Sequence, residues 1–187
     1  MMAKLLEDID INAWTKLKNA VLTTDSGFHF LTLGSVDEQG LPQIRIVVLR
    51  GVDPLERVLE FHTDIRSPKW REFGNNPHAT VLGYCPQTRL QLRLQGSIVM
   101  YDASSEIVEY AWDKLSSRMQ QTYAVAAPGS DVVNEAKATN NGKASFGVLL
   151  FKADSLDWCQ LAREGNQRAM LRYRAEGKLA SAKWVNA

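Results

Sequence analysis

Short strand-like segments separated by turn residues follow one another along most of this chain, and this succession limits its fold more than any other feature. Residues 28–36 precede a turn at residues 37–40, and residues 43–50 precede another turn at residues 51–54. Residues 89–100 begin by alternating leucines with arginines and glutamines, which is typical of a strand with one wet face. Because strands here follow strands, the pattern predicts a mainly β (α+β) fold built on an antiparallel barrel, and it disfavours a doubly wound parallel sheet.

Three helices are expected to pack outside the barrel. Residues 10–22 place apolar side chains at helical spacing, and Asp10 is the expected cap of this helix. Ser67 and Pro68 favour the start of a second, short helix, because serine is a preferred N-cap and proline a preferred first helical residue. A further apolar stripe predicts a helix over residues 104–118.

The length of 187 residues is that of one domain, and a chain of this size buries enough surface to fold without disulfides. We therefore expect residues 1–187 to form a single domain. Its parts are a core, a loop-rich segment and a closing group of strands, at residues 12–120, 124–145 and 146–187. The closing group is interpreted as four strands, at residues 146–152, 155–161, 168–174 and 178–185.

Composition argues against several classes of protein. Lysine and arginine total 22 and aspartate and glutamate total 21, so the net charge of +1 disfavours a nucleic-acid coat. Cys85 and Cys159 have no zinc-site spacing, so we expect free thiols, as in a reducing cytosol, and no metal. No apolar run approaches the ~20 residues of a membrane helix, and acidic residues interrupt any N-terminal signal. We therefore expect a cytoplasmic protein without membrane or nucleic-acid partners.

Positive charge is concentrated between residues 66 and 93, although the whole chain is nearly neutral. This segment holds five basic residues and one acidic residue. Arg66 and Lys69 flank the expected helix start at Ser67, and helix N-termini bind anions such as phosphate. Thr63 and Ser67 add hydroxyl groups. These residues alone fit two interpretations, which are a phosphate site and a capped helix with a solvated basic face.

Five motifs carry a resemblance to a known family. They read RIVVLR, FHTD, SPK, NNP and QLRLQG, in that order, at residues 45–50, 61–64, 67–69, 75–77 and 91–96. With these motifs the chain resembles the pyridoxamine 5′-phosphate oxidase family of FMN-binding split barrels, and more closely its oxidase-related subfamily of uncertain substrate. The resemblance covers most of the predicted core and extends more loosely into the last third of the chain. It implies a split barrel, bound FMN and a homodimer with the flavin at the shared interface.

The resemblance also assigns roles to individual residues. Those that match the family's flavin site are Arg45, Ile46, Val47, Val48, Leu49, Arg50, His62, Thr63, Arg66, Ser67, Lys69, Gln91, Ser130, Trp158 and Arg168. Arg45 and Lys69 match the phosphate clamp, and Thr63 and Ser67 match its hydroxyl partners. The position of Arg45 in the sequence is consistent with this phosphate-binding role. Arg45 stands in an apolar strand and needs an anionic partner if it is buried.

Other matches concern the flavin ring. The backbone of residues 45–50 matches the strand that lies along the isoalloxazine ring. Gln91, Trp158 and Arg168 match side chains at the ring. Ser130 matches a serine that reaches the phosphate, and an ordinary turn is the alternative interpretation of its sequence context.

The chain departs from the family where true pyridoxamine-phosphate oxidases hold their substrate. Glu164 and Asn166 stand in place of the arginine and histidine of an Arg-x-His element. A carboxylate at residue 164 would repel a substrate phosphate. Pro68 replaces a further flavin arginine, for which Arg66 is the nearest substitute.

Several functions stay open. The leading hypothesis is an FMN-binding oxidoreductase with an unknown small-molecule substrate or electron donor. A true pyridoxamine-phosphate oxidase and a flavin-binding or flavin-carrying protein without turnover are the alternatives, and haem or deazaflavin binding is a lesser option. No catalytic residue is assigned, because His29, His62 and His78 lie on different predicted strands. His62 is expected to contribute its backbone to the flavin site.

Overall fold

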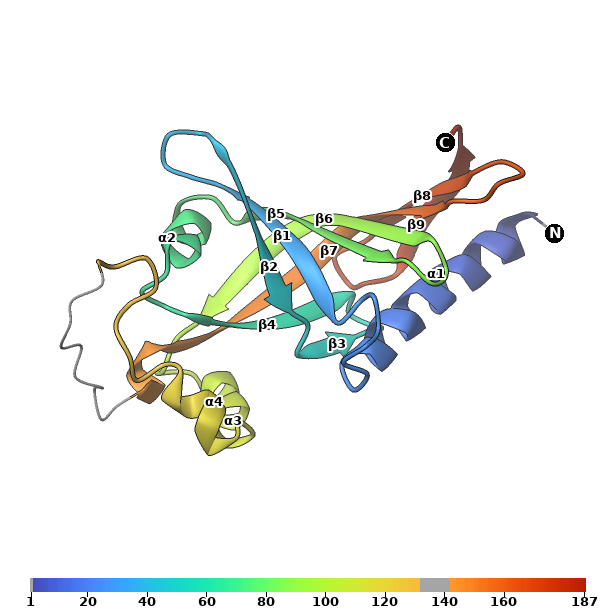
Figure 1. Ribbon diagram of the computed structural model, residues 1–187. Coiled ribbons are helices and arrows are strands. Elements are labelled where there is room, and N and C mark those ends of the chain that lie inside the picture. Colours follow the sequence, from blue (N-terminus) through green and yellow to red (C-terminus); the bar gives the residue numbers. More distant parts are fainter. Residues whose placement is uncertain (1, 132–141) are drawn as a thin grey trace.

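The computed structural model describes residues 2–131 and 142–187, and its strands form one curled antiparallel half-barrel (Figure 1). The helices of the described chain are α1 (Met2–Ala20), α2 (Pro68–Asn75), α3 (Glu106–Asp113) and α4 (Ser117–Gln121), with a 3-10 turn, η1, at Gly142–Ser145. The strands are β1 (Phe30–Val36), β2 (Pro42–Val48), β3 (Gly51–Asp53), β4 (Val58–Asp64), β5 (His78–Cys85), β6 (Leu90–Tyr101), β7 (Phe146–Gln160), β8 (Gln167–Tyr173) and β9 (Leu179–Val185). The predicted antiparallel, mainly β architecture is confirmed.

The order of strands explains where the barrel is open. It runs β2-β1-β5-β6-β7-β4-β3, and β8 joins through β7 and is followed by β9. Curling of the sheet brings β2 into contact with β4, although these two strands do not pair with each other. The opening between β2 and β4 is the split of the barrel, and the candidate site lies there.

Alternating strand residues face the inside of the sheet and form the main core. Leucines and a phenylalanine that are fully buried there include Leu31, Leu33, Leu59, Phe61, Leu92 and Leu94. α1 adds Trp14 and Leu17 to this core and packs against β3 and β9. At the opposite end, α3 covers the outer face of β7 through a second apolar cluster (Val108, Ala111, Phe146 and Val148).

Two helices differ from their predictions. α1 begins at Met2, because its buried stripe extends back to Leu6, and the prediction that Asp10 caps this helix is wrong. The helix predicted over residues 104–118 is divided into α3 and α4. The reason is local, since the Ser116 hydroxyl accepts a hydrogen bond from the Met119 backbone N–H and starts a new helix.

β7 is one strand of 15 residues, so the prediction of two strands at residues 146–152 and 155–161 is wrong. The irregularity lies in its partner, where the register of β6 shifts between Gln95 and Gly96. A Cβ atom at Gly96 would overlap the carbonyl oxygen of Lys152, so only glycine fits this bulge without a shift. β8 and β9 form a hairpin, and its turn holds Gly177 at φ 75°.

A closed network of buried polar groups, which we call the α1 clamp, fixes α1 to the sheet. The Asp10 carboxylate accepts hydrogen bonds from Arg57 Nη2 (2.6 Å) and from the Tyr173 hydroxyl (2.7 Å). The Trp14 indole donates to the same hydroxyl (3.0 Å). The Arg57 guanidinium carbon lies 5.3 Å and 4.9 Å from the ring centroids of Trp14 and Tyr173. Burial raises the pKa of Asp10 and outweighs the opposing effects of Tyr173 and Arg57.

Three further observations concern the classes considered from the sequence. Cys85 and Cys159 are free thiols. Within residues 2–131 and 142–187, no group of three or more metal-binding side chains converges. None of the helices in these ranges combines the length and the apolar composition that a membrane crossing requires.

Candidate functional site

Seven of the fifteen predicted site residues line one cavity at the split of the barrel, which we call the split cavity. It has a volume of about 330 Å³, within the range of small-molecule sites. It is lined by residues of β2, the following loop, β4, α2 and the segment after α4: Ile46, Val47, Val48, Arg50, His62, Thr63, Asp64, Lys69, Thr122, Tyr123 and Pro128. The structure thus brings motif residues between positions 46 and 69 together with residues 122–128, which belong to none of the motifs.

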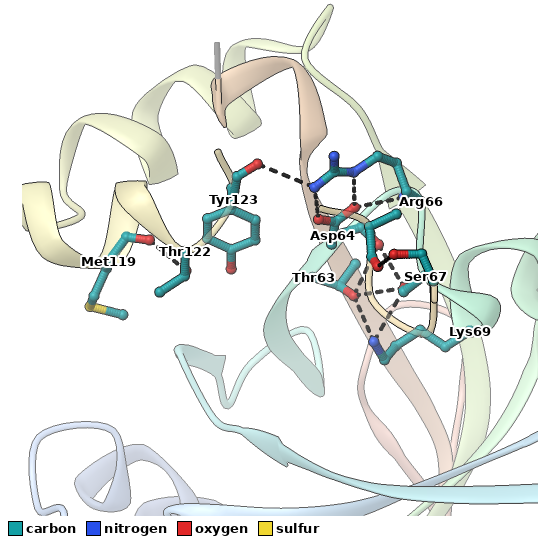
Figure 2. A network of polar contacts seen from close by, with 10 residues as sticks. Thr63, Asp64, Arg66, Ser67, Lys69, Met119, Thr122 and Tyr123 are labelled. Carbon is teal, nitrogen blue, oxygen red and sulfur yellow. Dashed lines mark hydrogen bonds and ion pairs between the residues drawn. The ribbon is translucent and has the colours of Figure 1, made fainter. Parts of the chain in front are cut away.

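Lys69 is the centre of the polar wall. Its Nζ donates hydrogen bonds to Thr63 Oγ1 (3.0 Å) and Ser67 Oγ (3.2 Å), as Figure 2 shows. Ser67 is the N-cap residue of α2, as predicted, but its hydroxyl donates to the Asp64 carbonyl (2.6 Å) instead of capping the helix. Burial, with a smaller effect of Arg45, lowers the pKa of Lys69. This ammonium and its two hydroxyl neighbours suit one anionic group.

Arg66 lies beside this cluster and is paired with an acid. Its Nε and Nη2 donate to the two carboxylate oxygens of Asp64 (2.9 Å and 2.6 Å), and Nη2 also donates to the Tyr123 carbonyl (3.3 Å) (Figure 2). Asp64 therefore offsets the charge of Arg66 and connects β4 to the segment after α4. Burial raises the pKa of the Tyr123 phenol to about 12, so this side chain adds no charge to the wall at neutral pH.

Arg45 has an anionic partner, but that partner belongs to α2. Arg45 Nη2 lies 2.6 Å from Glu72 Oε2, and Nη1 donates to the Ser35 hydroxyl (2.5 Å), which itself donates to Glu72. Arg45 does not line the split cavity, although it is near enough to Lys69 to affect its pKa. Sequence reasoning found the need for an anion at Arg45 and missed Glu72 as its source. The predicted contact of Arg45 with a phosphate remains a prediction.

His62 has one ring nitrogen paired and one unpaired. His62 Nε2 lies 2.7 Å from Glu60 Oε1, and the His62 side chain is 8% exposed. Nδ1 is buried without a hydrogen-bond partner among the described residues. The ring meets Phe146 edge to face, with centroids 5.0 Å apart. A buried polar atom without a partner calls for an explanation, because its desolvation is uncompensated.

Two of the predicted ring residues lie away from the split cavity, on the outer face of the sheet. Gln91 is opposite Cys159 and Cys159 is opposite Arg168, so these side chains form one row across β6, β7 and β8. Arg168 donates two hydrogen bonds to Asp157 (2.9 Å and 2.8 Å), and Arg93 donates a third (2.5 Å). These hydrogen bonds lower the pKa of Asp157, and those from Arg168 have the largest effect.

Three other predicted residues lie outside the split cavity. Trp158 neighbours this row but faces the other side of the sheet, where it packs on the core and meets Trp184 at 6.2 Å between ring centroids. Leu49 is buried in the main core. The Ser130 hydroxyl is exposed and donates to the Ala127 carbonyl (2.8 Å), which is the turn geometry named above as the alternative.

Sequence reasoning missed four lining residues, of which Asp64 stood inside a quoted motif. Thr122, Tyr123 and Pro128 come from the border of the loop-rich segment, where no periodicity pointed to a site. The aromatic Tyr123 in that polar stretch was the available signal. Residues 132–141, the middle of the loop-rich segment, lie outside the described residues.

A larger cavity, of about 480 Å³, lies near the far ends of β1 and β2 and the bulge at Gly96. Its lining includes the carboxylate of Asp154 but no lysine or arginine. The split cavity has Lys69 and Arg50 and is therefore better suited to an anionic ligand, despite its smaller volume.

Comparison of sequences connects the site with a family. The family profile described as "Pyridoxamine 5′-phosphate oxidase, FMN-binding domain" matches residues 11–102. A pyridoxine/pyridoxamine 5′-phosphate oxidase of Paraburkholderia xenovorans is 33% identical over 146 residues, which are 76% of this chain and 66% of the relative. A Burkholderia thailandensis protein of the same name is 44% identical over 68 residues, 36% of this chain and 31% of that protein. The chain thus spans between about one third and two thirds of these relatives.

Solved structures show the same fold. A pyridoxamine 5′-phosphate oxidase-related, FMN-binding protein from Nostoc punctiforme superposes with a TM-score of 0.77, at 22% identity and with 95% of each chain covered. PhzG from Burkholderia lata, solved with tetrahydrophenazine-1-carboxylic acid, gives 0.75 at 16% identity, with 95% of this chain and 90% of PhzG covered. The split barrel predicted from the motifs is confirmed. Through residues 11–102, the chain belongs to the family of pyridoxamine 5′-phosphate oxidase FMN-binding domains.

Proposed function

We propose that this protein is an FMN-dependent oxidoreductase that holds its cofactor in the split cavity. The observation that carries the proposal is the convergence of Lys69, Thr63 and Ser67 at the start of α2, beside the backbone of β2. A cation, two hydroxyls and a helix N-terminus together are what a phosphate group requires. The apolar side chains of β2 offer the kind of surface that a flat ring system requires.

The residues of the split cavity fit FMN in chemistry. Lys69 and Thr63 of the lining, with the neighbouring Ser67, would hold the phosphate, and Arg50 adds a second cation to the lining. Ile46, Val47 and Val48 would lie along the flavin ring. His62 also belongs to the lining, with its Nε2 paired to Glu60. When bound, FMN supplies the two-electron redox chemistry, and the protein binds it, orients it and excludes water.

We further propose that two copies of the chain form a homodimer over the outer face of the sheet. Ile44 and Ile46 of β2 are 77% and 65% exposed, and Phe30 of β1 is exposed on the same face. Ile46 also lines the split cavity, so a partner on this face would close it. The row of Gln91 and Arg168 lies on this face too, which would let each copy offer these side chains to the other copy's flavin.

The substrate remains open within this proposal. Curated relatives are named pyridoxine/pyridoxamine 5′-phosphate oxidases, which motivates a test of that activity. Against it, Glu164 is exposed, and the side-chain oxygen of Asn166 accepts a hydrogen bond from the Ala162 N–H (3.1 Å) and closes a turn. Oxygen-dependent formation of pyridoxal 5′-phosphate would establish the oxidase. Failure of every donor tried to reduce bound FMN would favour the non-catalytic flavin carrier. A cytoplasmic location remains a prediction.

The primary experiment is spectroscopic. The protein is purified, and its visible absorption is recorded before and after addition of FMN. We expect the two-banded flavin spectrum to co-purify or to appear with one FMN per chain, and FMN fluorescence to be quenched on binding. A protein that neither carries nor acquires FMN would overturn the proposal. Sedimentation of the same sample, together with an Ile44→Arg variant, tests the dimer, which this charge should dissociate.

A further inference from the structure

We propose that Glu72 is an internal competitor of the flavin phosphate, because its carboxylate holds the Arg45 guanidinium that a phosphate bound beside Lys69 would otherwise engage. This inference rests on the proposed function, since the phosphate is taken to be that of FMN. Glu72 belongs to none of the sequence motifs. It acts through Arg45 and is therefore a positioning residue that sets the affinity for the cofactor.

The first step is the state of the arginine. Arg45 Nη2 lies 2.6 Å from Glu72 Oε2, and the two side chains are only 21% and 9% exposed. The Ser35 hydroxyl accepts a hydrogen bond from Arg45 Nη1 and donates one to the same carboxylate oxygen. Glu72 thus holds the guanidinium both directly and through Ser35. The charge of Arg45 is balanced inside the protein as long as this pair persists.

The second step is the place of the pair relative to the phosphate-binding cluster. Glu72 and Lys69 are three residues apart on α2, a spacing that puts two side chains on the same face of a helix. Arg45 directly precedes Ile46 and Val47, which line the split cavity. After the larger effect of burial, Arg45 lowers and Glu72 raises the pKa of Lys69. The pair therefore borders the split cavity, although neither of its members lines it.

The third step is the exchange of anions. A guanidinium binds carboxylates and phosphates in the same bidentate manner, so both compete for the same donors. A phosphate monoester carries about −1.5 to −2 charges at pH 7 and a carboxylate only one, which favours the phosphate once it lies within reach. The exchange leaves the Glu72 carboxylate without its cation and close to a second anion. This cost is subtracted from the affinity for FMN.

The test is removal of the carboxylate charge. Glutamine has the shape of Glu72 and keeps a hydrogen-bond acceptor. We expect Glu72→Gln to tighten FMN binding roughly tenfold, and to leave the binding of riboflavin, which has no phosphate, unchanged. The matched control is Glu38→Gln, because Glu38 and Glu72 line the same polar cavity but Glu38 accepts an exposed hydrogen bond from Asn75 (3.3 Å). The control should change FMN affinity less than about twofold. Unchanged or weaker FMN binding by Glu72→Gln would overturn the inference.

A double-mutant cycle tests whether Glu72 acts through Arg45. In an Arg45→Gln protein, the further change Glu72→Gln should have no effect on FMN affinity. A tightening that persists without Arg45 would mean that Glu72 repels the phosphate directly, and it would overturn the inference. Ser35→Ala removes only the hydroxyl bridge and is a milder second variant. It should tighten FMN binding by roughly 2–5-fold, and unchanged or weaker binding would contradict the proposal.

Thermal unfolding gives a readout that a purely structural ion pair would not produce. Without FMN, Glu72→Gln leaves Arg45 without its anion, so its Tm should lie below that of the unaltered protein. Saturating FMN should remove most of this difference, because the phosphate replaces the carboxylate. Absence of FMN binding by the unaltered protein would overturn the proposed function and this inference together. Normal FMN binding, with the same difference in Tm at saturation as without FMN, would overturn this inference alone.

Discussion

The α1 clamp and the split cavity are both built from buried charged and aromatic side chains, but they treat these charges differently. In the clamp, Asp10, Arg57 and Tyr173 satisfy one another inside the protein. In the split cavity, His62 Nδ1 has no partner among the described residues, and Lys69 is held as a cation in a place that lowers its pKa. We infer from this difference that the clamp serves folding, and that the cavity, as proposed above, keeps its polar groups for a ligand at some expense of stability.

The largest expected effect on stability comes from breaking the clamp. Asp10→Leu leaves the Arg57 guanidinium buried without its anion, so we expect the free energy of unfolding to fall by about 3–5 kcal/mol. Urea denaturation measures this, and FMN affinity of the folded protein should not change. The matched control is Glu56→Ala, which removes an exposed ion pair with Lys152 and should cost less than about 1 kcal/mol. Equal losses for both variants would contradict the role of the clamp.

The converse test removes the cation of the split cavity. Lys69→Met should weaken FMN binding by roughly 10–100-fold, because a charge-assisted hydrogen bond to the phosphate is lost. Stability should stay the same or rise, since the substitution removes an ammonium whose pKa is lowered chiefly by burial. Riboflavin, which has no phosphate, should bind both proteins equally. An undiminished FMN affinity, or a loss of stability like that of Asp10→Leu, would remove the distinction between the two regions.

The pH dependence of stability should differ in sign between Asp10 and Asp157. The pKa of Asp157 is lowered by folding, so its contribution is present above the unfolded value near 3.9 and is lost as the pH falls. The pKa of Asp10 is raised by folding, so its contribution is present at low pH and is lost as the pH rises through the raised value. Asp157→Asn should therefore cost more at pH 7 than at pH 3, and Asp10→Asn should cost more at pH 3. Urea titrations at both pH values compare them.

The smallest expected effect concerns two serines that the family motifs treat alike. The Ser67 hydroxyl contacts Lys69, whereas the Ser130 hydroxyl closes an exposed turn. Ser67→Ala should weaken FMN binding by roughly 2–10-fold, the range of one neutral hydrogen bond, and Ser130→Ala by less than about twofold. Fluorescence titration distinguishes these values. A larger effect at Ser130 would mean that its turn reorganises around the phosphate.

Sequence reasoning predicted the features that depend on short-range patterns. Alternation identified the strands, and the Ser67–Pro68 pair identified the start of α2, because both are set by local backbone preferences. Glu72 and Asp64, which neutralise Arg45 and Arg66, were missed because pairing between side chains depends on tertiary packing. Asp10 was misjudged for the same reason, since only the fold reveals Arg57 and Tyr173 beside it.

For the site, the motifs located the split cavity but not its full lining. Lys69, Thr63 and His62 were predicted and are there, whereas Gln91 and Arg168 lie elsewhere on the same chain. A resemblance lists residues that serve one flavin and does not say which copy of the chain supplies each. Tyr123 was missed because a single aromatic residue beside a loop has no periodic signal.

The most direct test of the account is a crystal structure of the protein grown with FMN. The account predicts flavin in the split cavity, with its phosphate bound by Lys69, Thr63 and Ser67 and its ring along β2. Flavin density at another place, for example in the larger cavity beside Gly96, with Lys69 still bound only to Thr63 and Ser67, would contradict it.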